Sequence, residues 1–284
     1  MGRVKIIADS TCDLSEEQLD TYDISAIPLT IYLGEESYTD GIDIFPEDIY
    51  AWSDNTKLTP KTASPSFEYI MNTLKRFDNN DTEIVFIGIS EKMSVTCNTL
   101  RLAAAELERA KLYVVDSMNL STGIGLLVLS AAKMAQKGMG GEEIVSRLEE
   151  LRVKVKASFV VDTLTFLHRG GRCSSVAKLL ANTLKLKPEI YVENGSMEVG
   201  KKYRGKQESV IYKYAADRKE SMLNAEKEMI FITHSGCDEN IIRRVEDFIK
   251  ELNYFDEVFI TRAGGVISSH CGPGTLGVLY ISKQ

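Results

Sequence analysis

The chain has 284 residues, of which 44% are hydrophobic and 26% are charged, and this length suits about two domains of ordinary size. Its 34 Lys and Arg residues against 41 Asp and Glu residues give a formal charge of −7, which excludes a broad basic surface for nucleic acid or anionic lipid headgroups. The longest apolar stretches are far shorter than the roughly 20 residues of a membrane span. The first residues lack the pattern of a secretory signal. We therefore expect a cytoplasmic protein that binds no nucleic acid and does not insert stably into membranes.

The first half of the chain alternates strand-like and helix-like segments, as a parallel sheet requires. Apolar runs predict strands at residues 3–8, 27–33, 83–89 and 112–115. Capping residues and helix propensity predict a helix start at 13–17 and helices at 99–110 and 122–136. This half is therefore expected to be an α/β unit with helices between its strands.

From about residue 158 the predicted strands are shorter and are separated by glycine turns. This pattern indicates a second α/β domain with a mixed sheet and helices on one face. Strands are predicted at 159–161, 189–192, 230–233, 258–261 and 278–281, with helical patterns at 174–184, 208–227 and 240–252. The one candidate boundary is a charged run at 149–154. We predict two domains, 1–155 and 156–284.

The cysteines and histidines predict neither a disulfide framework nor a metal site. The five cysteines are odd in number and never spaced C-x-x-C, which favours reduced thiols. The three histidines form no local ligand pair, so a metal ion would need ligands from distant segments. We expect no metal ion and no cofactor.

Three polar loops, at residues 9–13, 61–66 and 90–96, carry most of the hydroxyl groups that could act on a ligand. Loops after parallel strands meet at one edge of the sheet, where they and helix N-termini can bind an anionic group. The alternative for each loop is that its Ser, Thr and Asp residues cap helices. Both interpretations stay open on the sequence alone.

Two glycine-rich segments, 167–174 and 269–277, have no nucleotide-binding signature. The second contains a literal G-x-G-x-x-G, but a dinucleotide fingerprint must open a helix, and only seven residues follow Gly277. No G-x-x-x-x-G-K-[ST] occurs in the chain. A tight turn into a last strand explains the second segment better than a nucleotide site.

Five motifs in order resemble those of the DegV family, and they extend over nearly the whole chain. They are residues 8–14, 61–66, 89–96, 164–174 and 270–277. The resemblance implies an α/β/α N-terminal domain with a short parallel sheet, a C-terminal domain with a six-stranded mixed sheet, and a lipid tunnel between them. The family includes the fatty-acid-binding subunits of bacterial fatty acid kinase.

The resemblance also implies roles for individual residues around a fatty-acid carboxylate. Thr62 and Ser94 match hydroxyls that hold the carboxylate, and His270 matches the histidine that closes the same pocket. Ser64 and Gly272, in the same motifs, complete the predicted ligand site. The resemblance implies no catalytic residue in this chain.

Three arginines match basic positions near the mouth of the pocket, where a kinase subunit would dock. They are Arg169, Arg172 and Arg204. The chain departs from the family pattern by having Val95 where Gly is usual and Cys271 where Thr is usual. Both differences place larger or more polarizable atoms next to the predicted head-group site.

These observations predict a carrier that buries a long-chain fatty acid and presents its carboxylate to a separate fatty acid kinase catalytic subunit for acyl-phosphate formation. Burying about 16 carbons at roughly 0.8 kcal/mol per methylene contributes about 12 kcal/mol before ordering costs. One alternative is a lipid sensor, which the sequence does not distinguish from a carrier. Another is an acyl hydrolase that uses Ser94 and His270, although no G-x-S-x-G elbow surrounds Ser94.

Overall fold

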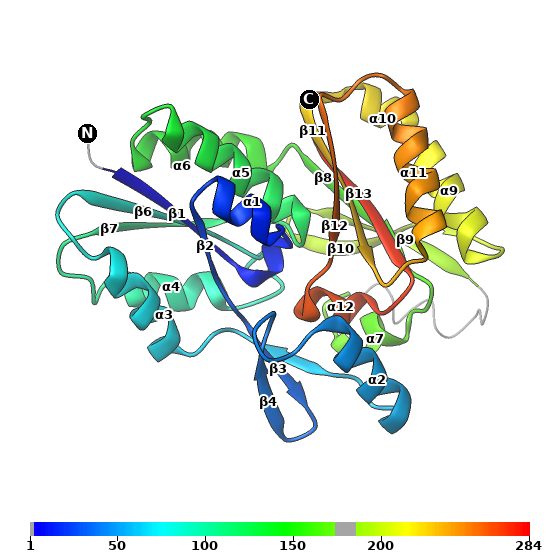
Figure 1. Ribbon diagram of the computed structural model, residues 1–284, viewed down its shortest axis with the longest axis horizontal. Coiled ribbons are helices and arrows are strands. Elements are labelled where there is room, and N and C mark those ends of the chain that lie inside the picture. The colour runs from blue at the N-terminus through cyan, green and yellow to red at the C-terminus, as the bar shows by residue number, and fades with distance from the viewer. Residues whose placement is uncertain (1–2, 174–185) are drawn as a thin grey trace.

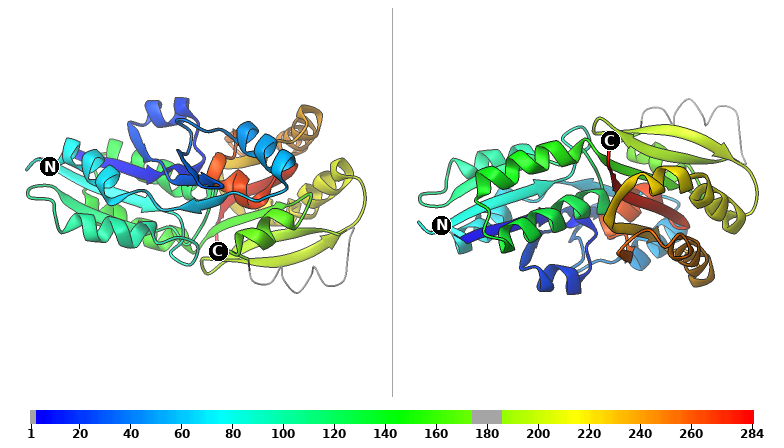
Figure 2. Two further views of the ribbon diagram at one scale, coloured as in Figure 1. Left: turned by 90° about the horizontal axis from the view of Figure 1, so that it is seen from below. Right: turned by 90° about the horizontal axis from the view of Figure 1, so that it is seen from above.

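The computed structural model describes residues 3–173 and 186–284 as an α/β fold with two halves side by side (Figures 1 and 2). The first half contains a parallel sheet of four strands in the order β2-β1-β6-β7. Its strands are β1 Arg3–Asp9, β2 Ile24–Ile27, β6 Thr82–Gly88 and β7 Lys111–Asp116. Because parallel strands end at one edge, the loops after β1, β6 and β7 lie on the same side, toward the second half (Figure 1).

Helices cover both faces of this sheet, because successive side chains of each strand point to opposite faces. Ile7 packs with α3 and α4 on one face, whereas Ile6 and Ala8 pack with α5 and α6 on the other. The helices of this half are η1 Ser10–Cys12, α1 Glu16–Thr21, α3 Phe67–Leu74, η2 Lys75–Phe77, α4 Thr96–Ala104, α5 Thr122–Gln136 and α6 Gly141–Arg152. In the described part of the chain, no helix is both long and apolar enough to cross a membrane.

A separate antiparallel sheet of three strands, in the order β4-β3-β5, projects from the first half (Figure 1). Its elements are β3 Thr30–Leu33, β4 Glu36–Thr39, α2 Pro46–Thr56 and β5 Lys61–Ala63. The predicted single strand at 27–33 is therefore wrong. Pro28 separates β2 from β3, because its φ is fixed and it has no N–H to donate to a neighbouring strand. The two strands join different sheets.

The second half contains a mixed sheet of six strands in the order β10-β9-β8-β13-β11-β12, in which β11 and β12 run parallel. Its strands are β8 Val155–Val160, β9 Lys187–Glu193, β10 Ser196–Tyr203, β11 Ala225–Ser235, β12 Glu257–Arg262 and β13 Thr275–Ser282. Three helices, α9 Gln207–Asp217, α10 Lys219–Leu223 and α11 Glu239–Glu251, pack on one face. Two short helices, α7 Thr165–Gly170 and α12 Gly265–Cys271, lie near the small three-stranded sheet (Figure 1).

Some predicted helices differ from the structure at their ends. The helix at 122–136 has the predicted bounds, but the helix at 99–110 occupies Thr96–Ala104 because the chain must turn before β7. The pattern at 208–227 is wrong as one helix, since it comprises α9, α10 and the start of β11. The pattern at 174–184 lies outside the described residues. The predicted division at residue 155 falls at the start of β8 and stays a prediction.

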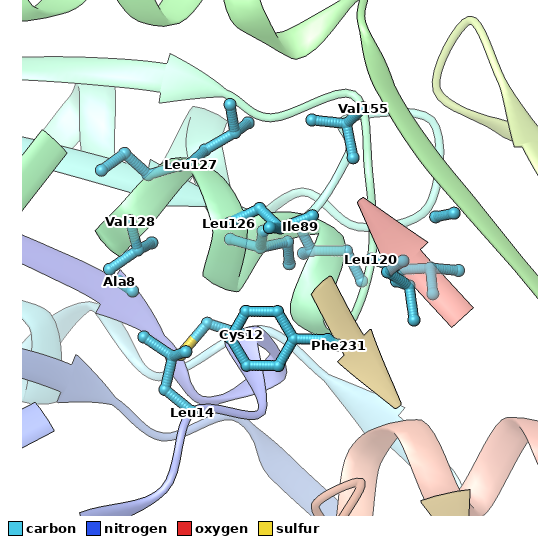
Figure 3. Packing of buried hydrophobic residues seen from close by; sticks show 14 of the residues in the cluster. Ala8, Cys12, Leu14, Ile89, Leu120, Leu126, Leu127, Val128, Val155 and Phe231 are labelled. Atoms are coloured by element: carbon cyan, nitrogen blue, oxygen red, sulfur yellow. The ribbon is translucent and has the colours of Figure 1, made fainter. Parts of the chain in front are cut away.

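Helix α5 joins the two halves through a shared apolar core, part of which Figure 3 shows. Leu126, Leu127 and Val128 on this helix are fully buried, and they belong to one cluster with Ala8 of β1 and Phe231 of β11. Each fully buried aliphatic side chain contributes about 1.5–3 kcal/mol relative to exposure. The face of the six-stranded sheet opposite α9, α10 and α11 therefore packs against α5 of the first half.

Buried carboxyl groups lie next to this core, where the loop after β1 meets the second half. Asp9 Oδ2 accepts a hydrogen bond from the N–H of Ile89 at 2.8 Å. Asp13 Oδ1 accepts from the N–H of Gly264 at 2.8 Å, and its Oδ2 accepts from Ser121 Oγ at 2.5 Å. Burial raises the pKa of Asp9 to about 6 and, with the neighbouring acids, the pKa of Asp13 to about 8.

Asp13 makes stability depend on pH. Between an unfolded pKa near 4 and the folded value of about 8, the folded protein keeps a proton that the unfolded chain has lost. The free energy of unfolding therefore falls as pH rises through this window, by at most about 1.4 kcal/mol per pH unit. Asp13→Asn cannot titrate and tolerates the φ of +50° at this position. We expect urea unfolding at pH 6 and pH 8 to show a smaller loss in the variant, and equal losses would contradict this protonation.

Candidate functional site

A cavity of about 390 Å³ lies where the two halves and the small sheet meet. Its apolar lining comes from both halves and includes Ile89, Leu120, Phe159, Met197 and Leu279. A few polar side chains also face it. An apolar cavity of this size with a few polar groups has the general character of a site for a small, largely apolar molecule.

Thr62 and His270 lie against each other at this cavity, although 208 residues separate them in the sequence. Thr62 is in β5, where its backbone is in register with Ile31 of β3. His270 is in the last turn of α12. Thr62 Oγ1 and His270 Nε2 are 2.8 Å apart, so the structure brings these two predicted residues together as a hydrogen-bonded pair from different halves.

His270 is uncharged at neutral pH. Burial, together with the positive charge of Arg172, lowers the pKa of His270 to about 4. Its Nδ1 is buried and has no hydrogen-bond partner among the described residues. This imidazole can share one proton with an incoming group, and a negative charge placed beside it would favour its protonation.

Ser94 and Ser64 line the same cavity as Thr62. Ser94 follows β6, and its Oγ lies 2.8 Å from Thr96 Oγ1 and accepts from the N–H of Thr96 at 3.3 Å. Its hydroxyl therefore also supports the backbone at the start of α4. In the 61–66 loop, the capping alternative holds for Ser66, whose Oγ accepts from the N–H of Tyr69 at 3.1 Å.

Gly272 is the predicted site residue that does not line the cavity. It ends α12 with a φ of +74°, a conformation that glycine adopts without strain. A Cβ at this position would lie 2.5 Å from the ring of Phe166. Its place in the structure is the turn that follows His270, so its predicted contact with a ligand stays a prediction.

The three predicted docking arginines lie in different surroundings. Arg172 lines the cavity and donates from Nη1 to the carbonyl of Gly170 at 2.8 Å, so it also holds its own turn. Arg169 is exposed and donates to the carbonyl of Lys57 at 3.0 Å. Arg204 is exposed just after β10 and does not line the cavity.

A DegV family model, described as a family of uncharacterised proteins, matches residues 3–283. The chain belongs to the DegV family. A DegV domain-containing protein of Clostridium perfringens is 31% identical over 283 residues, covering all of both chains. A fatty-acid-binding DegV family protein from Thermus thermophilus is 28% identical, with a TM-score of 0.89 and coverage of 99% of each chain. A stearic-acid-binding protein from Eubacterium ventriosum is 27% identical, with a TM-score of 0.85 and coverage of 99% of this chain and 98% of that one.

The predicted DegV fold is confirmed. Solved DegV structures superpose on nearly the whole chain, and the four-stranded parallel sheet and six-stranded mixed sheet are both present. The fold brings together the loops that the sequence motifs occupy, because β5, α7 and α12 converge at the cavity. Helix α12 lies between α7 and the small sheet, and this arrangement places His270 beside Thr62.

This DegV protein also has a polar group at the cavity that the motifs did not reveal. Thr233, His234 and Ser235 end β11 and line the cavity. The Thr233 hydroxyl bonds to that of Thr122 on α5 at 2.6 Å. The signal was available in the sequence, since a polar run follows a predicted buried strand there as it does after 3–8 and 83–89.

Gly170 provides a test of how closely His270 is held. A Cβ on Gly170 would lie 2.4 Å from His270 Nδ1, so Gly170→Ala must displace the imidazole. We expect a loss of about 1–3 kcal/mol in the free energy of unfolding and a changed His270 signal in histidine-labelled NMR spectra.

Gly171→Asn is the matched control for this substitution. Gly171 has open space around it and a φ of +69°, which asparagine tolerates. The control should leave the His270 signal unchanged. A Gly170→Ala protein with the wild-type His270 signal would contradict the close packing.

Proposed function

We propose that the protein binds a long-chain fatty acid in this cavity, with the carboxylate at Thr62, Ser94 and His270 and the acyl chain along the apolar lining. The observation that carries the proposal is the Thr62–His270 pair in the wall of an otherwise mostly apolar cavity. Ser64 is close enough to line the same space. The relatives from Thermus thermophilus and Eubacterium ventriosum, described as fatty-acid-binding proteins, support the same ligand class.

The chemistry of the cavity matches both parts of such a ligand. Each buried methylene contributes about 0.8 kcal/mol, so the acyl chain supplies most of the affinity. The carboxylate must be paired, because a buried unpaired charge is costly. Rotation of the Thr62 and Ser94 hydroxyls would provide charge-assisted hydrogen bonds, and the nearby Arg172 guanidinium favours the negative charge.

The hydrogen bonds of Ser94, the candidate nucleophile, and of His270, the candidate base, favour ligand binding over acyl hydrolysis. A serine hydrolase needs its serine next to its histidine. Here the Ser94 hydroxyl is bonded to Thr96, and His270 Nε2 is bonded to Thr62. We therefore favour a non-catalytic protein, and between a sensor and a carrier we propose the carrier.

As a carrier of the cytoplasm, the protein would present the carboxylate to a separate fatty acid kinase catalytic subunit, which forms the acyl phosphate. Arg169 and Arg204 are the proposed docking residues. Both are exposed on a chain with a net charge of −7, so local positive charge would steer an acidic partner surface. Arg172 would act from the cavity itself, where it could stabilise the transferring phosphoryl group.

Removing both hydroxyls tests the ligand site. Thr62→Val with Ser94→Ala deletes two hydrogen bonds to a charged group, each worth about 1.5–3 kcal/mol, so fatty-acid affinity should fall at least about 100-fold. Lipid retained by purified protein is measured by solvent extraction and mass spectrometry. Ser66→Ala, which removes a helix cap in the same loop, should cost stability but retain lipid. A double variant with as much lipid as wild type would place the carboxylate elsewhere.

If the exposed arginines dock the kinase subunit, substituting them should lower kinase turnover without changing lipid binding. We expect Arg169→Ala and Arg204→Ala to keep their bound lipid and to lose several-fold in acyl-phosphate formation with a reconstituted kinase subunit and ATP, mostly through weaker partner affinity. Arg109→Ala is the control, because this exposed arginine precedes β7 and so lies at the opposite edge of the parallel sheet. Unchanged turnover in both test variants would exclude docking through these arginines.

A further inference from the structure

Helix α12 is held at both of its ends by groups from the first half of the chain. At its C-terminal end, His270 Nε2 lies 2.8 Å from Thr62 Oγ1. At its N-terminal end, the N–H of Gly265 donates to Asp40 Oδ1 at 2.8 Å. The preceding N–H, that of Gly264, donates to Asp13 Oδ1 at 2.8 Å. Two buried carboxyl groups therefore accept the first free N–H groups of this helix.

The small three-stranded sheet carries the groups that hold the two ends. Thr62 is in β5, and Asp40 directly follows β4. The N–H of Asp40 donates to the carbonyl of Leu29 at 3.0 Å, just before β3 begins. Because β3 pairs with both β4 and β5, the distance between the two holding groups is set by one sheet. The helix lies along that sheet and contacts β3 and β5.

The Asp40 carboxyl group has little freedom to move. Its side chain is buried, and Oδ2 accepts from Ser10 Oγ at 2.7 Å. Ser10 Oγ in turn accepts from the N–H of Leu29 at 3.1 Å. The helix also approaches closely, since a Cβ on Gly265 would lie 2.8 Å from Asp40 Oδ1 and 2.7 Å from Ile31 Cδ1.

We infer that Asp40, with Asp13 beside it, is a positioning residue that fixes α12 along its axis and thereby keeps His270 in the carboxylate site. From Gly265 to His270 the helix rises only about 7.5 Å, so a shift at its N-terminal end moves the imidazole by a similar amount. A displacement of about 1 Å is enough to disrupt a bound polar group. The consequence for the ligand rests on the proposed fatty-acid function, whereas the position of His270 does not.

The test compares Asp40→Ala with Asp40→Asn in the full-length protein after removal of lipid. Asparagine keeps an oxygen for the Gly265 N–H, whereas alanine removes it. Asp78→Ala is the control, because this partly exposed carboxylate accepts N–H groups of Glu108, Arg109 and Ala110 at another site. The readouts are the NMR titration of His270, assigned with His270→Gln, and the affinity for palmitic acid.

We expect Asp40→Ala to raise the midpoint of the His270 titration toward that of a hydrated imidazole and to weaken palmitic acid binding at least about tenfold. Asp40→Asn should stay close to wild type in both measurements. Asp78→Ala should lower stability without either change. If Asp40→Ala does not fold, Ser10→Ala is the second variant, because it keeps the Asp40 carboxyl group and removes its hydrogen bond from Ser10 together with the one that the Leu29 N–H donates to Ser10. It should give smaller changes in the same direction.

Two results would overturn the inference: a wild-type His270 titration in a folded Asp40→Ala protein, or the same changes in Asp78→Ala. A third result separates the inference from the proposed function. If wild-type protein binds no palmitic acid while Asp40→Ala still shifts His270, the fatty-acid function fails and the positioning role of Asp40 stands.

Discussion

The packing of α5 between the two sheets is the constraint on which the cavity depends. This helix is mostly apolar and buried, and it contacts β1 and β6 on one side and β8, β11 and β13 on the other. Because the helix is buried against both sheets, separating the two halves would expose a large apolar area to water. The hydrogen bond between Thr122 and Thr233 crosses the same junction. The cavity lies at the end of this shared core, so the packing of the core fixes the relative positions of the cavity walls.

Neither half contains all the residues of the proposed head-group site. Thr62 on β5 and Ser94 in the loop after β6 come from the first half, whereas His270 and Arg172 come from the second. Most of these polar groups pair with one another in the structure, through the Thr62–His270 and Ser94–Thr96 contacts, and His270 Nδ1 has no partner among the described residues. A buried cluster of hydroxyls and a neutral imidazole costs little while it is internally paired. Such a cluster can exchange those contacts for a carboxylate without building new backbone structure, which is the advantage of a preorganised site.

The buried acids near α12 show how an acidic chain can place carboxyl groups in its interior. Asp9, Asp13 and Asp40 each accept hydrogen bonds from main-chain N–H groups that have no partner within regular secondary structure. Burial raises the pKa of all three, so their retention costs free energy that an apolar residue would avoid. Each carboxyl group in turn fixes the position of a loop or a helix end by hydrogen bonding to it.

The sequence alone determined the alternation of strands and helices, the bounds of α5 and the family, and it supplied the residues of the proposed head-group site, because these depend on local periodicity and on motifs contiguous in the chain. Tertiary structure decided the rest. Pro28 splits an apolar run between two sheets, and the 208–227 pattern divides because β11 needs its first residues for pairing. The contact between Thr62 and His270 depends on elements 208 residues apart, and the role of Asp40 depends on a helix 225 residues away. No local sequence pattern encodes contacts between residues so far apart in the chain, since these contacts follow from how α5, the small sheet and α12 pack together.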